Sequence, residues 1–198
     1  SHPEYQGQCL FPRLAERTYE HIDAQRYACV YGVGNANSTP SLVRKIGFQL
    51  VSPLDVRIGV SALKPDRLQI EQASQFRRVW NADDLNWRCK NTVNPMSWAK
   101  NKDGQQYVYA NSINRLIKVF SPVYPGDSVQ RELGIMPLGL KLFMGLMPRG
   151  SCRFREYIAL PDFLKPSPLN MVYKPLHTDV KTLDPEAVTF GFQDFDAY

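Results

Sequence analysis

The first 60 residues alternate between helical and strand patterns, and this alternation restricts the folds open to the chain more than any other feature. Apolar or aromatic residues recur at helical spacing from Leu10 to about Ala24. Tyr27 to Val33 is a nearly continuous apolar run, typical of a strand covered on both faces. A second helix is expected to end at Gly47, and Phe48 to Val60 reads as strand, broken at Ser52-Pro53. This order predicts an α/β layer.

The turn between the first strand and the second helix is rich in residues that cap helices. It reads Gly34-Asn35-Ala36-Asn37-Ser38, and Pro40 then fits the first turn of the helix. Asn and Ser side chains satisfy free amides at a helix start. A capping role alone is therefore an alternative to any ligand contact for Asn37 and Ser38.

A polar loop containing a glycine, His2 to Phe11, leads directly into the first helix. The beginning of a helix presents unpaired N–H groups and a partial positive charge, so such a loop can hold a phosphate without a basic side chain. An ordinary helix entry has the same composition. The loop alone does not distinguish the two interpretations.

Three segments in this order resemble the GNAT superfamily of acyl-CoA-dependent N-acyltransferases, over about residues 1–60. They are Gln6-Gly7-Gln8-Cys9-Leu10-Phe11, Asn35-Ala36-Asn37-Ser38 and Lys45-Ile46-Gly47-Phe48. In that family a Q/R-x-x-G-x-G/A loop binds the coenzyme diphosphate, and an N-x-N-S element precedes a helix that ends in K-x-G-F. The resemblance implies acetyl-CoA or another acyl-CoA as cosubstrate and an amine as acceptor.

The resemblance also assigns positions to the coenzyme. It places the diphosphate at Gln6, Gly7, Gln8, Cys9, Leu10 and Phe11. It places the pantetheine arm beside Tyr31, Gly32 and Val33, where strand splaying in such folds exposes backbone groups, and it lets Asn37 and Ser38 cap the second helix or touch the coenzyme. Cys9 and Phe11 depart from the small residues of the family pattern, and their added bulk would weaken coenzyme binding.

No catalytic residue is assigned. Family members that use general-acid catalysis often place a Tyr on the helix after the Asn motif, but Thr39 to Ile46 contains none. Direct attack by an oriented amine remains open, because holding two reactants together supplies much of the rate. The leading expectation is an acyltransferase that moves an acetyl or other acyl group to an amine. The alternative is a noncatalytic binding or assembly module with a GNAT-like fold.

The resemblance begins partway through a GNAT domain, which has helices and strands before its diphosphate loop. Residues 1–63 are therefore expected to be the coenzyme-binding half of a GNAT-like domain, and residues 68–198 a second GNAT-like α/β domain. Leu85-Asn86-Trp87-Arg88 resembles the opening of such a second, degenerate domain; Trp87 is expected in its core and Arg88 beside a buried carbonyl or carboxylate. A permuted or swapped arrangement is the alternative. The fold class is α/β (α+β), a mixed sheet flanked by helices.

Further elements are expected along the rest of the chain. Leu68 to Trp80 has a helical pattern, and Gly134 to Leu146 fits helix or strand equally. The expected strands are Met96–Lys100 and Gln105–Asn111 around an Asp103-Gly104 turn, then Arg115–Val123, Phe154–Leu160, Leu169–Lys174 and Val188–Phe195.

Composition narrows the partners. Hydrophobic residues make up 43% and charged residues 22%, the balance of a globular protein that buries a core. The +5 charge is scattered, so nucleic acid is not an expected partner. The four cysteines form no C-x-x-C pair, which favours free thiols and the cytoplasm, and no metal site is assigned. No apolar run approaches the roughly 18 residues of a membrane span, so no membrane partner is expected. A homodimer with strand or domain exchange is kept as an option.

Overall fold

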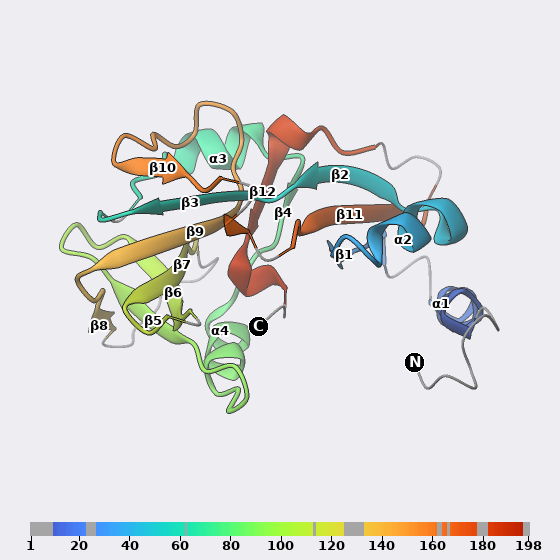
Figure 1. Cartoon of the computed structure of the whole chain (residues 1–198), viewed down its shortest axis with the longest axis horizontal. Helices are drawn as coiled ribbons and strands as arrows, with labels where there is room; N and C mark the ends of the chain where they lie inside the picture. Colours follow the sequence, from blue (N-terminus) through green and yellow to red (C-terminus); the bar gives the residue numbers. More distant parts are fainter. Residues whose placement is uncertain are drawn as a thin grey trace. The chain divides into compact units, whose positions relative to one another are not determined.

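A computed structural model describes residues 10–22, 27–61, 63–112, 114–124, 133–161, 164–165, 167–177 and 182–195. The fold is α+β, with strands of mixed orientation flanked by helices, as the sequence predicts (Figure 1). The chain forms two compact units. The first unit comprises residues 1–53 and 167–182, and the second unit comprises residues 54–166 and 183–198.

The first unit follows the predicted order of helix, strand, helix and strand. Its elements are α1 (Leu10–His21), β1 (Cys29–Gly34), α2 (Thr39–Ile46), β2 (Gln49–Pro53) and, from far along the chain, β11 (Asn170–Pro175). The sheet order is β1-β11-β2, and β11 runs antiparallel to both neighbours. The strands β1 and β2 are therefore parallel to each other with β11 between them.

One core cluster of the first unit lies between α2 and the sheet. Ile46, Phe48 and Val172 are buried together. The half-buried side chains packed against them are Ala15, Tyr19, Val30 and Leu42. The helix α2 ends at Gly47, which has φ 77°, a backbone conformation that favours glycine and turns Phe48 into this core.

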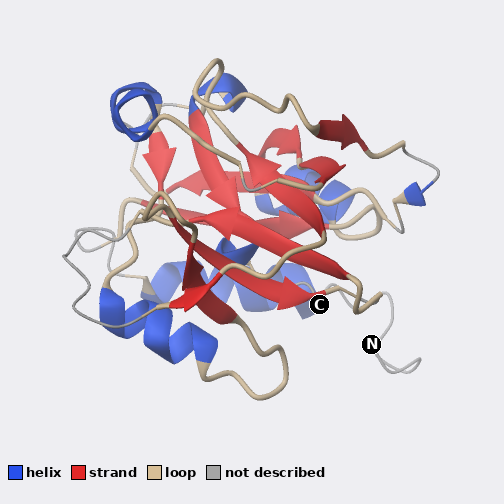
Figure 2. Cartoon of the chain, turned by 90° about the vertical axis from the view of Figure 1, so that its left-hand side faces the viewer, coloured by secondary structure: helices blue, strands red, loops and turns tan. Residues whose placement is uncertain are grey.

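The second unit holds the larger sheet, shown in Figures 1 and 2. Its elements are β3 (Asp55–Gly59), α3 (Arg67–Ala73), β4 (Phe76–Arg77), α4 (Ala82–Cys89), β5 (Ser97–Lys100), β6 (Gln106–Asn111), β7 (Ile117–Pro122), β8 (Gly134–Ile135), β9 (Leu140–Leu146), β10 (Tyr157–Ala159), η3 (Pro185–Ala187), β12 (Val188–Gly191) and η4 (Phe192–Asp194). The strands follow the order β10-β3-β9-β7-β6-β5-β8, and β12 pairs with both β9 and β4.

Aromatic side chains are prominent in one core cluster of the second unit. The buried members of this cluster are Leu63, Tyr107, Phe120, Met136, Phe143 and Tyr157. Tyr107 and Phe120 lie on paired strands with ring centroids 6.0 Å apart. The Tyr107 hydroxyl donates a 2.6 Å hydrogen bond to the Leu63 carbonyl, which satisfies the one polar atom that this ring buries.

Several local predictions are confirmed in the second unit. Asn101 to Gly104 form the turn of the predicted hairpin between β5 and β6, with Gly104 at φ 81°. The ambiguous run from Gly134 to Leu146 contains two strands and no helix: β8 at its start, and β9, which pairs with both β3 and β7.

The helix predicted from Leu68 to Trp80 is too long. It ends at Ala73, and β4 then pairs with β12 in parallel. Pairing with a distant strand overrides the helical pattern here. Trp87 is also misassigned, because its side chain is 70% exposed while Trp80 is buried. Arg88 is buried and donates from Nη2 to the Phe195 carbonyl at 2.8 Å, as expected of it.

The compact units differ in extent from the domains expected at residues 1–63 and 68–198. The strand β11 belongs to the first unit, because it completes the sheet of β1 and β2. Lys64 to Asp66, between the two expected domains, lies within the second unit. There the Asp66 side chain accepts from the Gln69 amide at 3.1 Å and caps α3.

Candidate functional site

The predicted coenzyme residues fall in three places. Gln6, Gly7, Gln8 and Cys9 lie outside the described residues. Leu10 and Phe11 form the start of α1, with 44% and 53% of their surfaces exposed. The other predicted residues, Tyr31, Gly32, Val33, Asn37 and Ser38, lie on β1 and before α2, so the described members all belong to the first unit.

The start of α1 has the chemistry that an anion requires. The first amides of an α-helix have no partner within the helix, which applies to Leu10 and Phe11, whereas Pro12 has no N–H. The first turn contains no acidic residue and one arginine, Arg13. The macrodipole adds partial positive charge at this end. Amides, dipole and guanidinium therefore favour the same sign of ligand.

An open hollow of about 510 Å³ lies along this helix. Its described lining is Leu10, Arg13, Leu14, Glu16, Arg17 and Glu20. Arg17 and Glu20 form an exposed ion pair at 3.3 Å, so their charges largely compensate one another. Arg13 is the cation that lies in the first turn, beside the unpaired amides.

The opposite face of α1 fixes the helix to the sheet of the first unit. Tyr19 packs against Phe48 with the two rings tilted at 57° and their centroids 6.3 Å apart. The Lys174 ammonium lies 4.9 Å from the Tyr19 ring centroid and donates to the Ile46 carbonyl. These contacts hold the C-terminal part of α1 against the sheet. Leu10, Phe11 and Leu14, nearer the start of the helix, are exposed.

At the start of α2, in contrast to α1, the backbone amides have hydrogen-bond partners in the preceding turn. The Asn35 Oδ1 atom accepts from the Asn37 amide at 3.0 Å and from the Ser38 amide at 2.9 Å. Thr39 donates its amide to the Asn35 carbonyl, and Ser41 and Leu42 donate theirs to the Ser38 carbonyl. The remaining residue of this stretch is a proline without an N–H.

The turn before α2 therefore uses its amides in its own hydrogen bonds. The Ser38 hydroxyl is bonded to the Asn35 side chain and also accepts from the Asn35 amide, although Ser38 stands at the N-cap position. Asn35, which sequence reasoning did not single out, is the residue that organises the turn. An Asn three residues before a Ser at a helix start is the signal that could have identified it.

The strand β1 pairs along its whole length with β11. Tyr31 lies opposite Tyr173, Gly32 opposite Val172, and Val33 opposite Met171. Since β11 lies between β1 and β2, the predicted pantetheine residues have a paired side, and β1 is an edge strand among the strands that the structure describes. A Cβ added at Gly32 would meet no atom within 4 Å, so there is space beside this residue.

Pairing with β11 also brings a thiol and a phenol together. Cys29 forms a side-chain hydrogen bond with Tyr173 at the beginning of β1. Burial raises the pKa of the Cys29 thiol, and burial also raises the pKa of Tyr173 to about 12. Both groups therefore stay protonated near neutral pH. Cys29 is a weak nucleophile in this state, because the thiolate is the reactive form.

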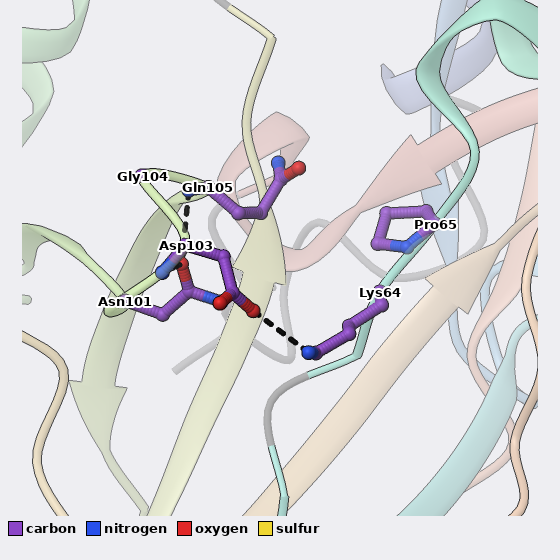
Figure 3. Close-up of a pocket in the computed structure, with 6 residues that line it drawn as sticks. All are labelled: Lys64, Pro65, Asn101, Asp103, Gly104 and Gln105. Atoms are coloured by element: carbon purple, nitrogen blue, oxygen red, sulfur yellow. Dashed lines mark hydrogen bonds and ion pairs between the residues drawn. The ribbon is translucent and has the colours of Figure 1, made fainter.

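A second hollow, of about 300 Å³, lies in the second unit (Figure 3). An ion pair spans it, with Lys64 Nζ 2.7 Å from Asp103 Oδ2, as the dashed line in the figure shows. The hydrogen bond with Asp103 raises the pKa of Lys64. The Asn101 Oδ1 atom accepts from the amides of Asp103 and Gln105 and holds the turn. The two charges satisfy each other at the surface, so this hollow is a poorer ligand site than the one along α1.

A buried polar group in the second unit joins its C-terminal segment to the rest of that unit. The Asp194 carboxylate accepts from Trp80 Nε1 at 2.8 Å and from the Gly191 amide at 2.7 Å. Burial raises the pKa of Asp194 to about 6, against the opposing influence of these hydrogen bonds and of Arg78 and Arg88. These contacts join η4 to Trp80, and we assign them a structural role.

No metal centre emerges within the described ranges, where no three His, Cys, Asp or Glu side chains gather closely enough to hold an ion. Cys29 and Cys152 are free thiols. Of the helices that the structure describes, none combines the length and apolar character needed to cross a bilayer.

Comparisons with known proteins leave the geometry as the basis for any assignment. No protein-family model, no curated protein and no solved structure matches the chain.

Proposed function

We propose that the first unit binds acyl-coenzyme A and that the protein transfers the acyl group to an amine. The observation that carries the proposal is the start of α1. Its first amides lack partners within the helix, and Arg13 lies beside them in a turn without acidic residues. A diphosphate bears the negative charge that this arrangement favours.

The pantetheine arm would lie along the outer edge of β1. A free strand edge can pair with an extended, amide-containing chain, and pantetheine is such a chain. The open space beside Gly32 supports this path, because a ligand could approach the backbone closely there. The succession of α1 and β1 thus offers an anion site followed by an edge for an amide-containing arm.

The transfer itself would be direct. The amine nitrogen attacks the thioester carbonyl carbon, the carbon–sulfur bond breaks, and coenzyme A leaves as the thiol once a proton has been transferred. A covalent cysteine intermediate is disfavoured at Cys29, whose pKa is raised by burial. Orienting the two reactants then provides the main rate advantage. The free Cys29 and Cys152 thiols are consistent with placing this activity in the reducing cytoplasm, without a membrane partner.

Titration calorimetry with acetyl-CoA tests the proposal, using Arg13→Glu as the informative variant. A carboxylate in the first turn favours the helix but repels a phosphate, so helix stability and ligand affinity should move in opposite directions. We expect about tenfold weaker binding, the equivalent of about 1.4 kcal/mol.

Arg44→Glu is the matched control. It makes the same charge change at an exposed position in the last turn of α2, within the same unit. Its affinity should equal that of the unmodified protein. Equal weakening by both variants would show that the effect is one of net charge, and absence of binding at about millimolar acetyl-CoA would reject the proposal.

Binding without turnover would support the alternative, a noncatalytic module that retains the coenzyme site. The assay is release of free coenzyme thiol in the presence of candidate amines. If turnover falls in parallel with acetyl-CoA affinity in the Arg13→Glu variant, the acyltransferase proposal is supported over the noncatalytic module.

A further inference from the structure

Aliphatic side chains gather at one end of the larger sheet in the second unit. The end of β3, the beginnings of β9, β7 and β10, and the end of β6 all meet there, as their pairing registers require. Figure 2 turns the left-hand side of Figure 1 towards the viewer and so faces this end. The exposed fractions are 60% for Val60, 78% for Leu116, 96% for Leu138, 42% for Leu140 and 73% for Ile158.

The strand registers place further aliphatic side chains on one face, and of these Ile58, Ile117 and Leu142 are half-buried. Ile158 lies opposite Ile58, Ile58 lies opposite Leu142, and Ile117 lies opposite Leu140. Residues directly opposite one another, and residues two apart on a strand, share a face. We call Ile58, Ile117, Leu140, Leu142 and Ile158 the aliphatic face, with Leu116 and Leu138 at its end.

Direct contacts show that the separate connections lie close together. The Lys141 ammonium donates to the Val60 carbonyl at 3.0 Å and to the Gly139 carbonyl at 3.2 Å. A Cβ on Gly139 would lie 3.8 Å from the Leu116 carbonyl. The loops carrying Val60, Leu116 and Leu138 are therefore neighbours, each with an exposed aliphatic side chain, and we treat these side chains as one patch.

The charge around this patch is positive. Residues 58–61, 114–118, 133–142 and 155–158 contain three basic residues that reach the surface, Arg115, Lys118 and Arg155, and a single acidic residue, Glu156, whereas Lys141 is buried. Arg115 is exposed next to Leu116. A second copy of the chain docked by a two-fold axis would bring like charges together across an apolar contact. An occupant with carboxylates beside aliphatic side chains would complement both features.

We propose that the aliphatic face docks an acidic amphipathic helix of a partner protein. A contiguous apolar sheet face is normally buried against another element, and a helix with one apolar stripe is the element that sheets most often carry. Across four strands spaced about 4.8 Å apart the face spans roughly 15 Å, which a helix of about ten residues covers. Carboxylates at the margins of that helix would meet Arg115 and Arg155.

Fluorescence anisotropy with two labelled peptides tests the proposal. Both carry leucine at i, i+3, i+4 and i+7; one has glutamate on the flanking positions and the other has lysine. We expect the glutamate peptide to bind, and the lysine peptide to bind at least about tenfold more weakly. Arg115→Glu should weaken binding of the glutamate peptide and so reduce the difference in affinity between the two peptides.

The variant Leu116→Ser/Leu138→Ser removes two exposed side chains and should weaken the glutamate peptide by about tenfold or more. The matched control is Leu68→Ser/Val93→Ser, which changes side chains 70% and 83% exposed elsewhere in the same unit and should leave binding unchanged. Circular dichroism checks that both variants are folded.

Three outcomes would overturn the proposal. The first is that neither peptide binds, or that both bind equally. The second is that the site variant and the control variant bind alike. The third is an ultracentrifugation result in which the chain dimerises without peptide and Leu116→Ser/Leu138→Ser abolishes the dimer, which would assign the face to a second copy.

Discussion

The two compact units bury cores of different kinds. The second unit encloses aromatic rings within a sheet of many strands, where Tyr107, Phe120 and Phe143 are fully buried. In the first unit three strands and two helices pack around a cluster of three buried residues, Ile46, Phe48 and Val172, and α1 has no buried residue. The largest fully buried rings therefore lie in the second unit. The first unit has a helix start that carries Arg13 and no acidic residue, where we propose that a ligand binds.

This comparison can be tested most strongly at Phe120. Phe120→Ala removes a fully buried ring that contacts Tyr107 and Tyr157, and should lower the free energy of unfolding of the second unit by about 3–5 kcal/mol. Urea denaturation measures the loss. Hydrogen exchange at β1 should change less than exchange at β6 and β7. An equal increase at β1 would show that the units do not differ in the way we describe.

A smaller effect is expected at the turn before α2. Asn35→Ala removes the acceptor for two amides and one hydroxyl, and should destabilise the first unit by about 1 kcal/mol. Thermal denaturation followed at the first unit measures it. Acetyl-CoA affinity should stay unchanged, because we place the anion at α1. A tenfold loss of affinity would move the anion site to α2.

The smallest effect concerns Asp194 and depends on pH. Burial raises its pKa in the folded state to about 6, above the ordinary value of 3.8, so the buried charge opposes folding. The stability contribution is greatest below the unfolded pKa and is lost as pH rises through 6. Lowering the pH from 7 to 5 should therefore recover about 1 kcal/mol in the second unit.

Asp194→Asn is the variant that isolates this contribution, since an amide oxygen can still accept from Trp80 and carries no charge. The difference in unfolding free energy between variant and parent should shrink as the pH falls from 7 to 5. A difference that is independent of pH would show that another group is responsible. Hydrogen exchange at β1 serves as the internal reference.

Local patterns predicted much of the fold because their physical causes are local. Gly47 ends α2 through its left-handed backbone, and Asp103-Gly104 sets the turn between β5 and β6. The broken strand around Ser52-Pro53 appears as β2 and β3. In each case the residues that cause the feature lie within a few positions of it.

Features that depend on distant partners were missed. The pattern from Leu68 to Trp80 predicts one helix, but β4 within it pairs with the distant strand β12. The sequence also does not distinguish Trp87, which is exposed, from Trp80, which is buried. In the candidate site, Leu10 and Phe11 stand at a helix start, as predicted. The bonding role of Asn35 requires atomic positions that no spacing rule supplies.

The insertion of β11 between β1 and β2 has a consequence for synthesis of the chain. A ribosome must translate as far as Pro175 before the first sheet can acquire its middle strand, and as far as Gly191 before β12 can join the second. The sheets of both units are therefore completed only when β11 and β12 have been synthesised. Early release of the nascent polypeptide would leave two incomplete sheets with unpaired edges. Pairing across such long separations also slows folding, which makes this interval the one in which the chain most needs protection from aggregation.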